Sequence, residues 1–299
     1  MRAASEARVT VLGLGIIGSR ALARLADCGW QVACWNRTPK GLAGEVPTPQ
    51  AAVTGAALIS IYLKDAPALR QVMAQVAPAL AAGQIVLNHS TVDLKTTHWL
   101  AQLCAERGCR FLDVPFTGSK LAAAGGNLVY YTGGDAELLK QVEPFLRITG
   151  RELLPCGGVG AATVVKLATN LVSACTVQAL AEALAIATRH GVSADCFIKA
   201  VGENVCGSPL SKMKLPSMAA GEFETHFSLD NMRKDTCYAL ALAASAGLET
   251  PAIEAVSKRM ADLCAGGLGH LDYSALSKPY LMEGAVIGDH QRVVGLTAK

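Results

Sequence analysis

The chain has 299 residues, of which 51% are hydrophobic and 17% charged, with a formal net charge of +3 at pH 7. This composition argues against a disordered chain, and the length suffices for one large domain or two ordinary ones. The sequence shows no Lys/Arg-rich run, no uninterrupted apolar stretch of membrane-spanning length and no apolar signal core, so we predict a soluble cytoplasmic protein that binds neither nucleic acid nor membrane.

A glycine-rich turn follows the first predicted strand, Arg8–Leu12. The turn consists of Gly13, Leu14, Gly15, Ile16, Ile17 and Gly18. A helix is predicted next over 19–28 and a second strand over 31–35, which is the context in which G-x-G-x-x-G binds a dinucleotide. The glycines permit a tight turn against the pyrophosphate, and the helix N-terminus offers free N–H groups to it. A glycine turn with a purely structural role is the alternative.

The residues after the second strand indicate which dinucleotide binds. NAD-binding proteins usually place Asp or Glu there, where it contacts the ribose 2′-hydroxyl. This chain instead has Asn36, Arg37 and Thr38, followed by Lys40. No carboxylate repels a 2′-phosphate, and an Arg side chain offers it charge-assisted bidentate hydrogen bonds. We therefore predict NADP (NADPH) as the cofactor, with a solvated turn as the alternative interpretation of Arg37.

Strands and helices continue to alternate through the first half. Further strands are predicted over 57–63, 85–88, 111–114, 128–132 and 152–155, and further helices over 67–80, 94–107 and 137–145. The strand over 128–132 is expected at an edge of the sheet. Ligands of such sheets bind outside the carboxyl ends of the strands. The residues expected to border the cofactor and substrate cleft are therefore Leu63, Thr91 and the loop of Pro115, Phe116, Thr117, Gly118 and Ser119.

The longest predicted helix covers 159–190 and is apolar on nearly every face. Three glycines open it, and Gly191 is the expected stop. Lys166 lies in its second turn, with Asn170 and Ser173 on the same face. Lys166 either has a functional role or extends its ammonium to solvent from the rim of a packed helix.

Only helices are predicted after residue 191. They cover 194–201, 209–218, 231–246 and 251–265. Helices that follow a half of alternating strands and helices indicate a second, all-α domain. We predict an α/β domain over 1–158 and an all-α domain over 159–299, opened by the long helix. The pair Lys234-Asp235 lies early in the helix over 231–246, either at the site or as a solvated charge pair.

The ten cysteines form no C-x-x-C pair, and the histidines show no metal-ligand spacing. Most cysteines lie in apolar runs, so small buried thiols are expected, with a catalytic cysteine as the alternative. No metal site is predicted.

Four motifs in order, GLGIIG, DVPFTGS, GVGAATVVKLATN and FSLDNMRKD, resemble those of the β-hydroxyacid dehydrogenase family. This family is similar to 6-phosphogluconate dehydrogenase and includes 3-hydroxyisobutyrate dehydrogenases, tartronate semialdehyde reductases and glyoxylate/succinic semialdehyde reductases. The chain resembles the last branch most, whose usual cofactor is NADPH, over about residues 8–285. The resemblance implies a Rossmann domain, a long interdomain helix and an all-α substrate domain that helps form a homodimer or homotetramer.

The resemblance also implies roles for individual residues. Lys166 matches the catalytic Lys and is expected to act as general acid/base when NADPH reduces a small carbonyl acid such as glyoxylate or succinic semialdehyde. Substrate contacts are expected at Thr117, Gly118, Ser119, Asn170, Phe227 and Asp235. Beyond the glycine turn and Asn36-Arg37-Thr38, cofactor contacts are expected at Leu63, Thr91 and Lys234. Two residues depart from the family pattern: Thr117 replaces a Ser, and Lys64 stands where many members have Pro.

Three alternative functions remain open. An NAD-linked dehydrogenase of the 3-hydroxyisobutyrate type shares every motif and differs in cofactor and direction. An imine reductase of related fold generally lacks this Lys, and a non-catalytic NADP-binding scaffold is expected to have lost it. Lys166 therefore counts against the last two.

Overall fold

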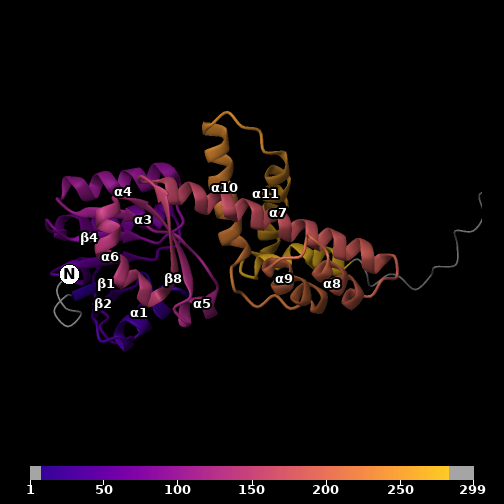
Figure 1. The fold of residues 1–299 in the computed structure, drawn as a ribbon, viewed down its shortest axis with the longest axis horizontal. Coiled ribbons are helices and arrows are strands. Elements are labelled where there is room, and N and C mark those ends of the chain that lie inside the picture. The colour runs from indigo at the N-terminus through magenta and orange to yellow at the C-terminus, as the bar shows by residue number, and fades with distance from the viewer. Residues whose placement is uncertain (1–7, 283–299) are drawn as a thin grey trace, which may run out of the picture. The chain divides into compact units, whose positions relative to one another are not determined.

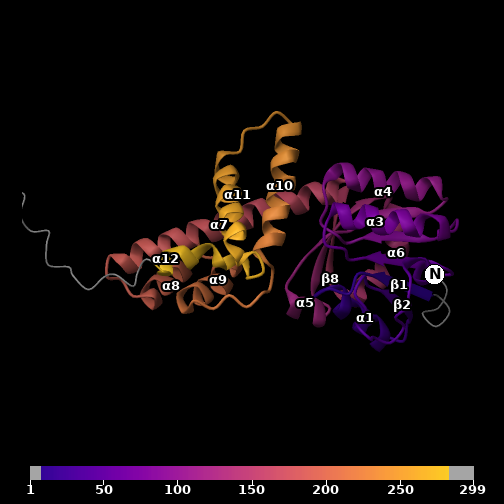
Figure 2. The ribbon, with the colours of Figure 1, turned by 180° about the vertical axis from the view of Figure 1, so that it is seen from behind.

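The computed structural model describes residues 8–282, which form two compact units. Unit 1 comprises the chain up to Leu171 together with Lys234–Glu249, and unit 2 comprises Val172–Arg233 and the chain from Thr250. Helices α7 (Ala161–Arg189) and α10 (Leu229–Ser245) each contribute residues to both units. Figures 1 and 2 show the elements from opposite sides. The predicted domain limits, 1–158 and 159–299, stay predictions.

Unit 1 is built on an eight-stranded sheet of order β2-β1-β3-β4-β5-β7-β6, with β8 paired to β7 outside this path. The strands are β1 (Arg8–Leu12), β2 (Gln31–Trp35), β3 (Leu58–Ile61), β4 (Ile85–Asn88), β5 (Arg110–Asp113), β6 (Phe116–Thr117), β7 (Leu128–Gly134) and β8 (Gly150–Gly157). Strands β1 to β5 are parallel. Their carboxyl ends therefore lie along one edge, where the turns after β1, β3, β4 and β5 come together.

Helices cover both faces of this sheet (Figure 1). They are α1 (Gly18–Asp27), α2 (Pro49–Val53), α3 (Ala66–Val76) with the 3₁₀ turn η1 (Ala77–Ala79), α4 (Leu94–Glu106), α5 (Lys120–Ala124) and α6 (Ala136–Thr149). One core packs α1, α5 and α6 against the sheet, and the other packs α2, α3 and α4 against its opposite face. Because both faces are covered, the central strands are mostly apolar, and all four residues of β3 are buried.

The predicted edge position of strand 128–132 is wrong. Tyr130 of β7 pairs with Phe116 of β6 on one side and with Leu153 of β8 on the other. Strand order depends on long-range pairing, which the composition of one strand does not reveal. The sequence also missed β6, α2 and α5, because a strand of two residues and helices of five residues are too short to show their periods.

The described residues of unit 2 form helical segments and no strand. Besides its parts of α7 and α10, unit 2 contains α8 (Ala194–Glu203), α9 (Pro209–Ala220), α11 (Pro251–Leu263), the π-helical segment η2 (Cys264–Leu268), the 3₁₀ turn η3 (Tyr273–Ser277) and α12 (Lys278–Met282). Figures 1 and 2 show α8, α9 and α12 beside the second half of α7. The prediction of an all-α region after the α/β half is confirmed.

Helix α7 has 29 residues and matches the predicted long helix. Its apolar window, with a mean hydropathy of 1.6, is long enough to cross a membrane, a test that a core helix of a soluble protein also passes. The expectation that no membrane is bound therefore stays a prediction.

The expectation of mostly buried cysteines is wrong. All ten are free, and only Cys34, Cys104 and Cys109 are buried. The exposed cysteines are Cys28, Cys196, Cys206 and Cys237. Apolar neighbours in the sequence misled the prediction, because they do not reveal which side of a helix faces outward.

Candidate functional site

The glycine turn after β1 has space for a ligand directly above its backbone. Gly13 has a φ of +96°, and a Cβ there would meet the Tyr62 carbonyl. A Cβ at Gly18 would meet the Gly13 carbonyl, whereas one at the exposed Gly15 would meet nothing within 4 Å. Helix α1 begins at Gly18 without a side-chain N-cap. This turn and the uncapped helix N-terminus fit the pyrophosphate of a dinucleotide.

The turn after β2 is tied to the glycine turn by Asn36. The Asn36 Oδ1 accepts the Leu14 N–H at 2.9 Å, and its Nδ2 donates to the Thr38 carbonyl at 2.7 Å. Arg37 and Thr38 are exposed. A cavity of about 720 Å³ lies here and is lined in part by Asn36, Arg37 and Gln50. Asn36 thus holds two turns together and leaves Arg37 available to a ligand.

Ser90, which was not among the predicted site residues, joins the turns after β3 and β4. Its Oγ accepts the Leu63 N–H at 2.8 Å and donates to the Ile61 carbonyl at 3.3 Å. The half-buried Thr91 follows it. A hydroxyl residue two positions after a predicted strand was the signal that could have identified Ser90. The two predicted cofactor contacts, Leu63 and Thr91, therefore lie on connected turns.

The loop predicted to hold the substrate carboxylate connects β6 to the short helix α5. Thr117 ends β6 and is exposed. Gly118 has a φ of +141°, and a Cβ there would lie 2.8 Å from Leu128 Cδ2. The Ser119 Oγ accepts the Ala122 N–H at 3.3 Å and so caps α5. Only glycine suits position 118, and Ser119 keeps an O–H that can donate to a ligand.

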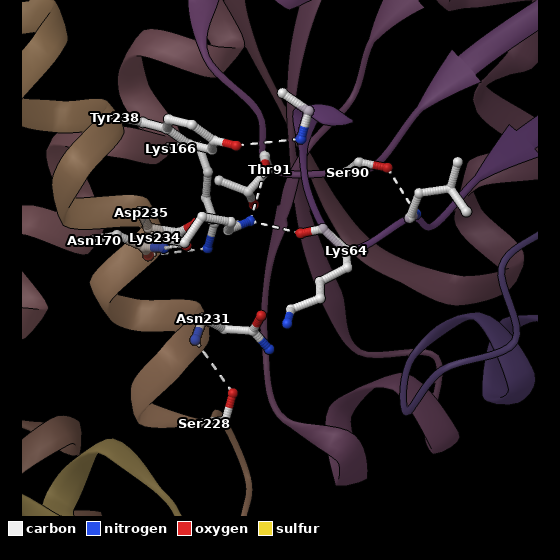
Figure 3. Close-up of polar contacts among 12 residues, drawn as sticks. Lys64, Ser90, Thr91, Lys166, Asn170, Ser228, Asn231, Lys234, Asp235 and Tyr238 are labelled. Carbon is white, nitrogen blue, oxygen red and sulfur yellow. Dashed lines mark hydrogen bonds and ion pairs between the residues drawn. The ribbon is translucent and has the colours of Figure 1, made fainter. Parts of the chain in front are cut away.

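Lys166 is the first member of a polar network within unit 1 (Figure 3). Its Nζ donates to Asn170 Oδ1 at 3.0 Å, one turn along α7. The Asn170 Nδ2 donates to Asp235 Oδ2 at 2.6 Å. The other carboxylate oxygen of Asp235 pairs with Lys234 Nζ at 3.0 Å. Three residues predicted for catalysis or substrate binding are thus directly connected, and Asn170 and Asp235 are buried.

Lys234 connects this network to the strand ends. Its Nζ donates to the carbonyls of Lys64 and Thr91, each at 2.8 Å. An ammonium has three N–H donors, and these two hydrogen bonds use two of them, while Asp235 Oδ1 forms an ion pair with the ammonium without a hydrogen bond. Tyr238 adds a further link, since its hydroxyl accepts the Ala66 N–H at 3.2 Å. Lys234 therefore fastens the turns after β3 and β4, and its predicted contact with the cofactor stays a prediction.

The pKa of Lys166 is lowered to about 8. Burial is the largest cause, because it disfavours the charged form of the amine. The Asp235 carboxylate acts in the opposite direction, and the Lys234 ammonium lowers the pKa further. An amine with this pKa exchanges its proton near neutral pH, as a general acid or base must.

Phe227 lies in unit 2, in a segment held by a buried ion pair. Its N–H donates to Asp272 Oδ2 at 3.1 Å, and its ring meets that of Tyr273 edge-on, with the centroids 6.0 Å apart. Asp272 Oδ1 pairs with Lys214 Nζ at 2.6 Å, and both side chains are buried. No sequence pattern indicated this pair. The predicted contact of Phe227 with substrate stays a prediction.

Two family models match consecutive parts of the chain. Residues 8–158 match the NAD binding domain of 6-phosphogluconate dehydrogenase, and residues 160–280 match the NAD-binding model of NADP-dependent 3-hydroxyisobutyrate dehydrogenase. The chain is 29% identical to glyoxylate/succinic semialdehyde reductase 2 of Arabidopsis thaliana, over 89% of this chain and 77% of that protein. It is 28% identical to reductase 1 of the same plant, over 90% and 96%.

A solved structure shares the fold. The 3-hydroxyisobutyrate dehydrogenase of Mycobacterium tuberculosis has a TM-score of 0.83 and 24% identity, and the match covers 91% of this chain and 98% of that chain. The predictions of a Rossmann domain, a long helix and an all-α region, and of an NAD(P)-dependent oxidoreductase, are confirmed. With the glycine turn and the Lys166 network in one unit, and with both halves matched, the chain belongs to the β-hydroxyacid dehydrogenase family.

Proposed function

We propose that this protein uses NADPH to reduce a small aldehyde acid to the hydroxy acid, with Lys166 as the general acid. The observation that carries the proposal is the half-buried Lys166 amine, whose pKa is lowered to about 8 and whose position Asn170 holds. The similarity to the two Arabidopsis reductases supports glyoxylate or succinic semialdehyde as the substrate class.

The residues divide the chemistry among them. When bound, the reduced nicotinamide supplies a hydride to the carbonyl carbon. Lys166 donates a proton to the carbonyl oxygen as negative charge develops there. Asn170 and Asp235 orient the amine, and Thr117, Gly118 and Ser119 hold the substrate carboxylate. In the reverse direction the neutral Lys166 accepts the hydroxyl proton.

Arg37 supports NADPH over NADH. Its guanidinium is exposed beside the cavity after β2, and no carboxylate stands at the end of that strand. A guanidinium binds a phosphate in a bidentate manner, which a 2′-hydroxyl cannot reproduce. NAD-linked oxidation of a 3-hydroxyacid is the second candidate, because the same residues serve it in reverse. The homo-oligomeric state and the cytoplasmic location stay predictions.

Substrate turnover tests the proposal directly. Oxidation of NADPH, and separately of NADH, is followed with glyoxylate, succinic semialdehyde, tartronate semialdehyde and methylmalonate semialdehyde. We expect turnover of at least one acid, with NADPH preferred. Loss of the general acid in Lys166→Met is expected to lower kcat about 10²- to 10⁴-fold while NADPH still binds.

The matched control is Lys140→Met, which removes an exposed Lys of α6 and is expected to leave kcat unchanged. Normal turnover in Lys166→Met would contradict the role of Lys166. Tight NADPH binding without turnover of any acid would favour an imine substrate or a scaffold.

A further inference from the structure

Lys64 brings an unpaired ammonium group to the polar network. It follows Leu63 in the turn after β3, and its backbone carbonyl accepts the Lys234 Nζ at 2.8 Å. Its side chain is exposed, and its ammonium makes no hydrogen bond or ion pair with the residues that the structure describes. Figure 3 shows this side chain extending away from its own carbonyl, without a contact. The turn is thus held through the Lys64 backbone carbonyl, and the Lys64 ammonium does not contribute to holding it.

A continuous series of contacts connects Lys64 to the proposed general acid. The Lys64 carbonyl contacts Lys234, which pairs with Asp235 at 3.0 Å. Asp235 contacts Asn170 at 2.6 Å, and Asn170 contacts Lys166 at 3.0 Å. All five residues lie in unit 1. The Lys64 backbone thus lies beside this network, and its ammonium stands on a flexible four-carbon stem that can turn toward a ligand bound there.

The charges around the network do not balance. Lys64, Lys166 and Lys234 bring three amines, whereas Asp235 is the one carboxylate in the series of contacts. Asp65 follows Lys64, but its carboxylate caps α3 by accepting the Ala68 N–H at 2.8 Å. A substrate with one carboxylate on the Thr117–Ser119 loop leaves the Lys64 charge uncompensated. An exposed ammonium near a binding site attracts a further anion through its charge.

We propose that Lys64 selects substrates that carry a second carboxylate, that is, formyl or hydroxymethyl derivatives of dicarboxylic acids. The inference rests on the proposed function and adds the substrate class. The first carboxylate binds the Thr117–Ser119 loop, the carbonyl or hydroxyl oxygen meets Lys166, and the second carboxylate pairs with the Lys64 ammonium.

The test compares substrates that differ only in the second charge. NADP⁺-dependent oxidation is measured with 2-(hydroxymethyl)glutarate, with its analogue in which the second carboxylate is an amide, and with 3-hydroxyisobutyrate. We expect kcat/KM of the dicarboxylate to exceed that of the amide about tenfold. This ratio lies between the contribution of an exposed ion pair and that of a desolvated ion pair. Lys64→Met is expected to abolish this preference, and Lys64→Arg to keep it. Added salt reduces the preference, since it screens the pair.

Three kinetic results would overturn the inference. The first is equal kcat/KM for the dicarboxylate and the amide in the unaltered protein. The second is a fall in kcat/KM in Lys64→Met that is the same for both acids and is accompanied by a higher KM for NADP⁺, which would assign Lys64 to the cofactor phosphates. The third is oxidation of 3-hydroxyisobutyrate alone, which would leave the proposed function standing and reject the role of Lys64.

A binding measurement separates this inference from the proposed function. The Lys166→Met variant, loaded with NADP⁺, is titrated calorimetrically with the dicarboxylate and with the amide. Tighter binding of the dicarboxylate that disappears in Lys64→Met/Lys166→Met supports the role of Lys64 even if turnover fails. Equal binding of the two acids rejects it.

Discussion

The proton carried by Lys166 sets the expected pH dependence. Its pKa of about 8 results from burial, which disfavours the ammonium, against the attraction of Asp235. Reduction needs the protonated amine, so kcat/KM for the aldehyde acid is expected to fall as pH rises through about 8. Oxidation needs the neutral amine, so kcat/KM for the hydroxy acid is expected to rise until about pH 8 and then level off.

Initial rates in both directions from pH 6 to pH 10 measure these profiles, with the cofactor saturating. The two limbs must have opposite slopes around one pKa. Profiles that slope in the same direction for reduction and oxidation would show that another group controls the proton transfer.

Arg37 is expected to determine cofactor choice through a single guanidinium. Because Arg37 is exposed beside the cavity after β2, its removal should not disturb the fold. Arg37→Ala is expected to raise the KM for NADPH about tenfold or more, as one charge-assisted contact with phosphate is lost, while the KM for NADH stays the same. The matched control is Arg147→Ala, an exposed Arg of α6. An equal change for both cofactors would contradict the assignment.

At the scale of elements, β5 holds the start of α7. The buried Asp113 ends β5, and its Oδ2 accepts both the N–H and the hydroxyl of Thr163 at 2.8 Å. Thr163 is the third residue of α7, so Asp113 acts as a long-range N-cap. Thr97 of α4 adds a hydroxyl contact to Thr163 at 2.9 Å. Lys166, one turn further, is thereby positioned relative to the strand ends.

Asp113→Ala is expected to lower the free energy of unfolding by about 1–3 kcal/mol, because a buried cap is lost and N–H groups stay unpaired. It is also expected to lower kcat while the dissociation constant of NADPH is kept, since the glycine turn is unaffected. Urea unfolding, steady-state kinetics and NADPH titration measure these effects. Asp113→Asn retains an acceptor and should lose less of each. A normal kcat in a destabilised Asp113→Ala would show that Asp113 stabilises the fold but does not position Lys166 for catalysis.

At the scale of the whole molecule, cofactor binding and the Phe227 segment belong to different units. The Lys214–Asp272 pair is buried in unit 2, and Asp272 also accepts the N–H groups of His226 and Phe227. Burial acts to raise the pKa of Asp272, but the Lys214 ammonium and the hydrogen bonds hold it below its ordinary value. The pair therefore stabilises the fold fully above the ordinary pKa of Asp, and this contribution is lost as pH falls through the lower folded value.

Lys214→Met is expected to cost about 3–5 kcal/mol of the free energy of unfolding, because it leaves the Asp272 carboxylate buried without its cation. The double variant Lys214→Met/Asp272→Asn should recover part of this loss. Urea unfolding at pH 7 measures both, and NADPH titration at low urea should still give full binding, since the glycine turn lies in unit 1. Loss of NADPH binding in an otherwise folded Lys214→Met would show that NADPH binding also depends on the Lys214–Asp272 pair.

Local patterns in the sequence were enough for much of this description. The strand, glycine turn and helix over 8–27 follow one another along the chain. Positions 13 and 18 have no room for a Cβ, because it would meet the Tyr62 carbonyl at position 13 and the Gly13 carbonyl at position 18. Lys166 and Asn170 were predicted together because residues four apart share a helix face, and their side chains do form a hydrogen bond. The types of the longer elements were also predicted correctly, because their periodicity is a local property of the sequence.

Only the tertiary structure revealed which groups meet across the chain. Asn170 and Asp235 are 65 residues apart, and Lys234 contacts a carbonyl 170 residues away. The interior position of β7, the capping of α7 by Asp113 and the bond from Leu63 to Ser90 are likewise long-range. Periodicity and motif spacing determine what each segment can form, whereas strand order and side-chain partners depend on how the segments pack, because burial lets a polar group contact only the neighbours that packing provides.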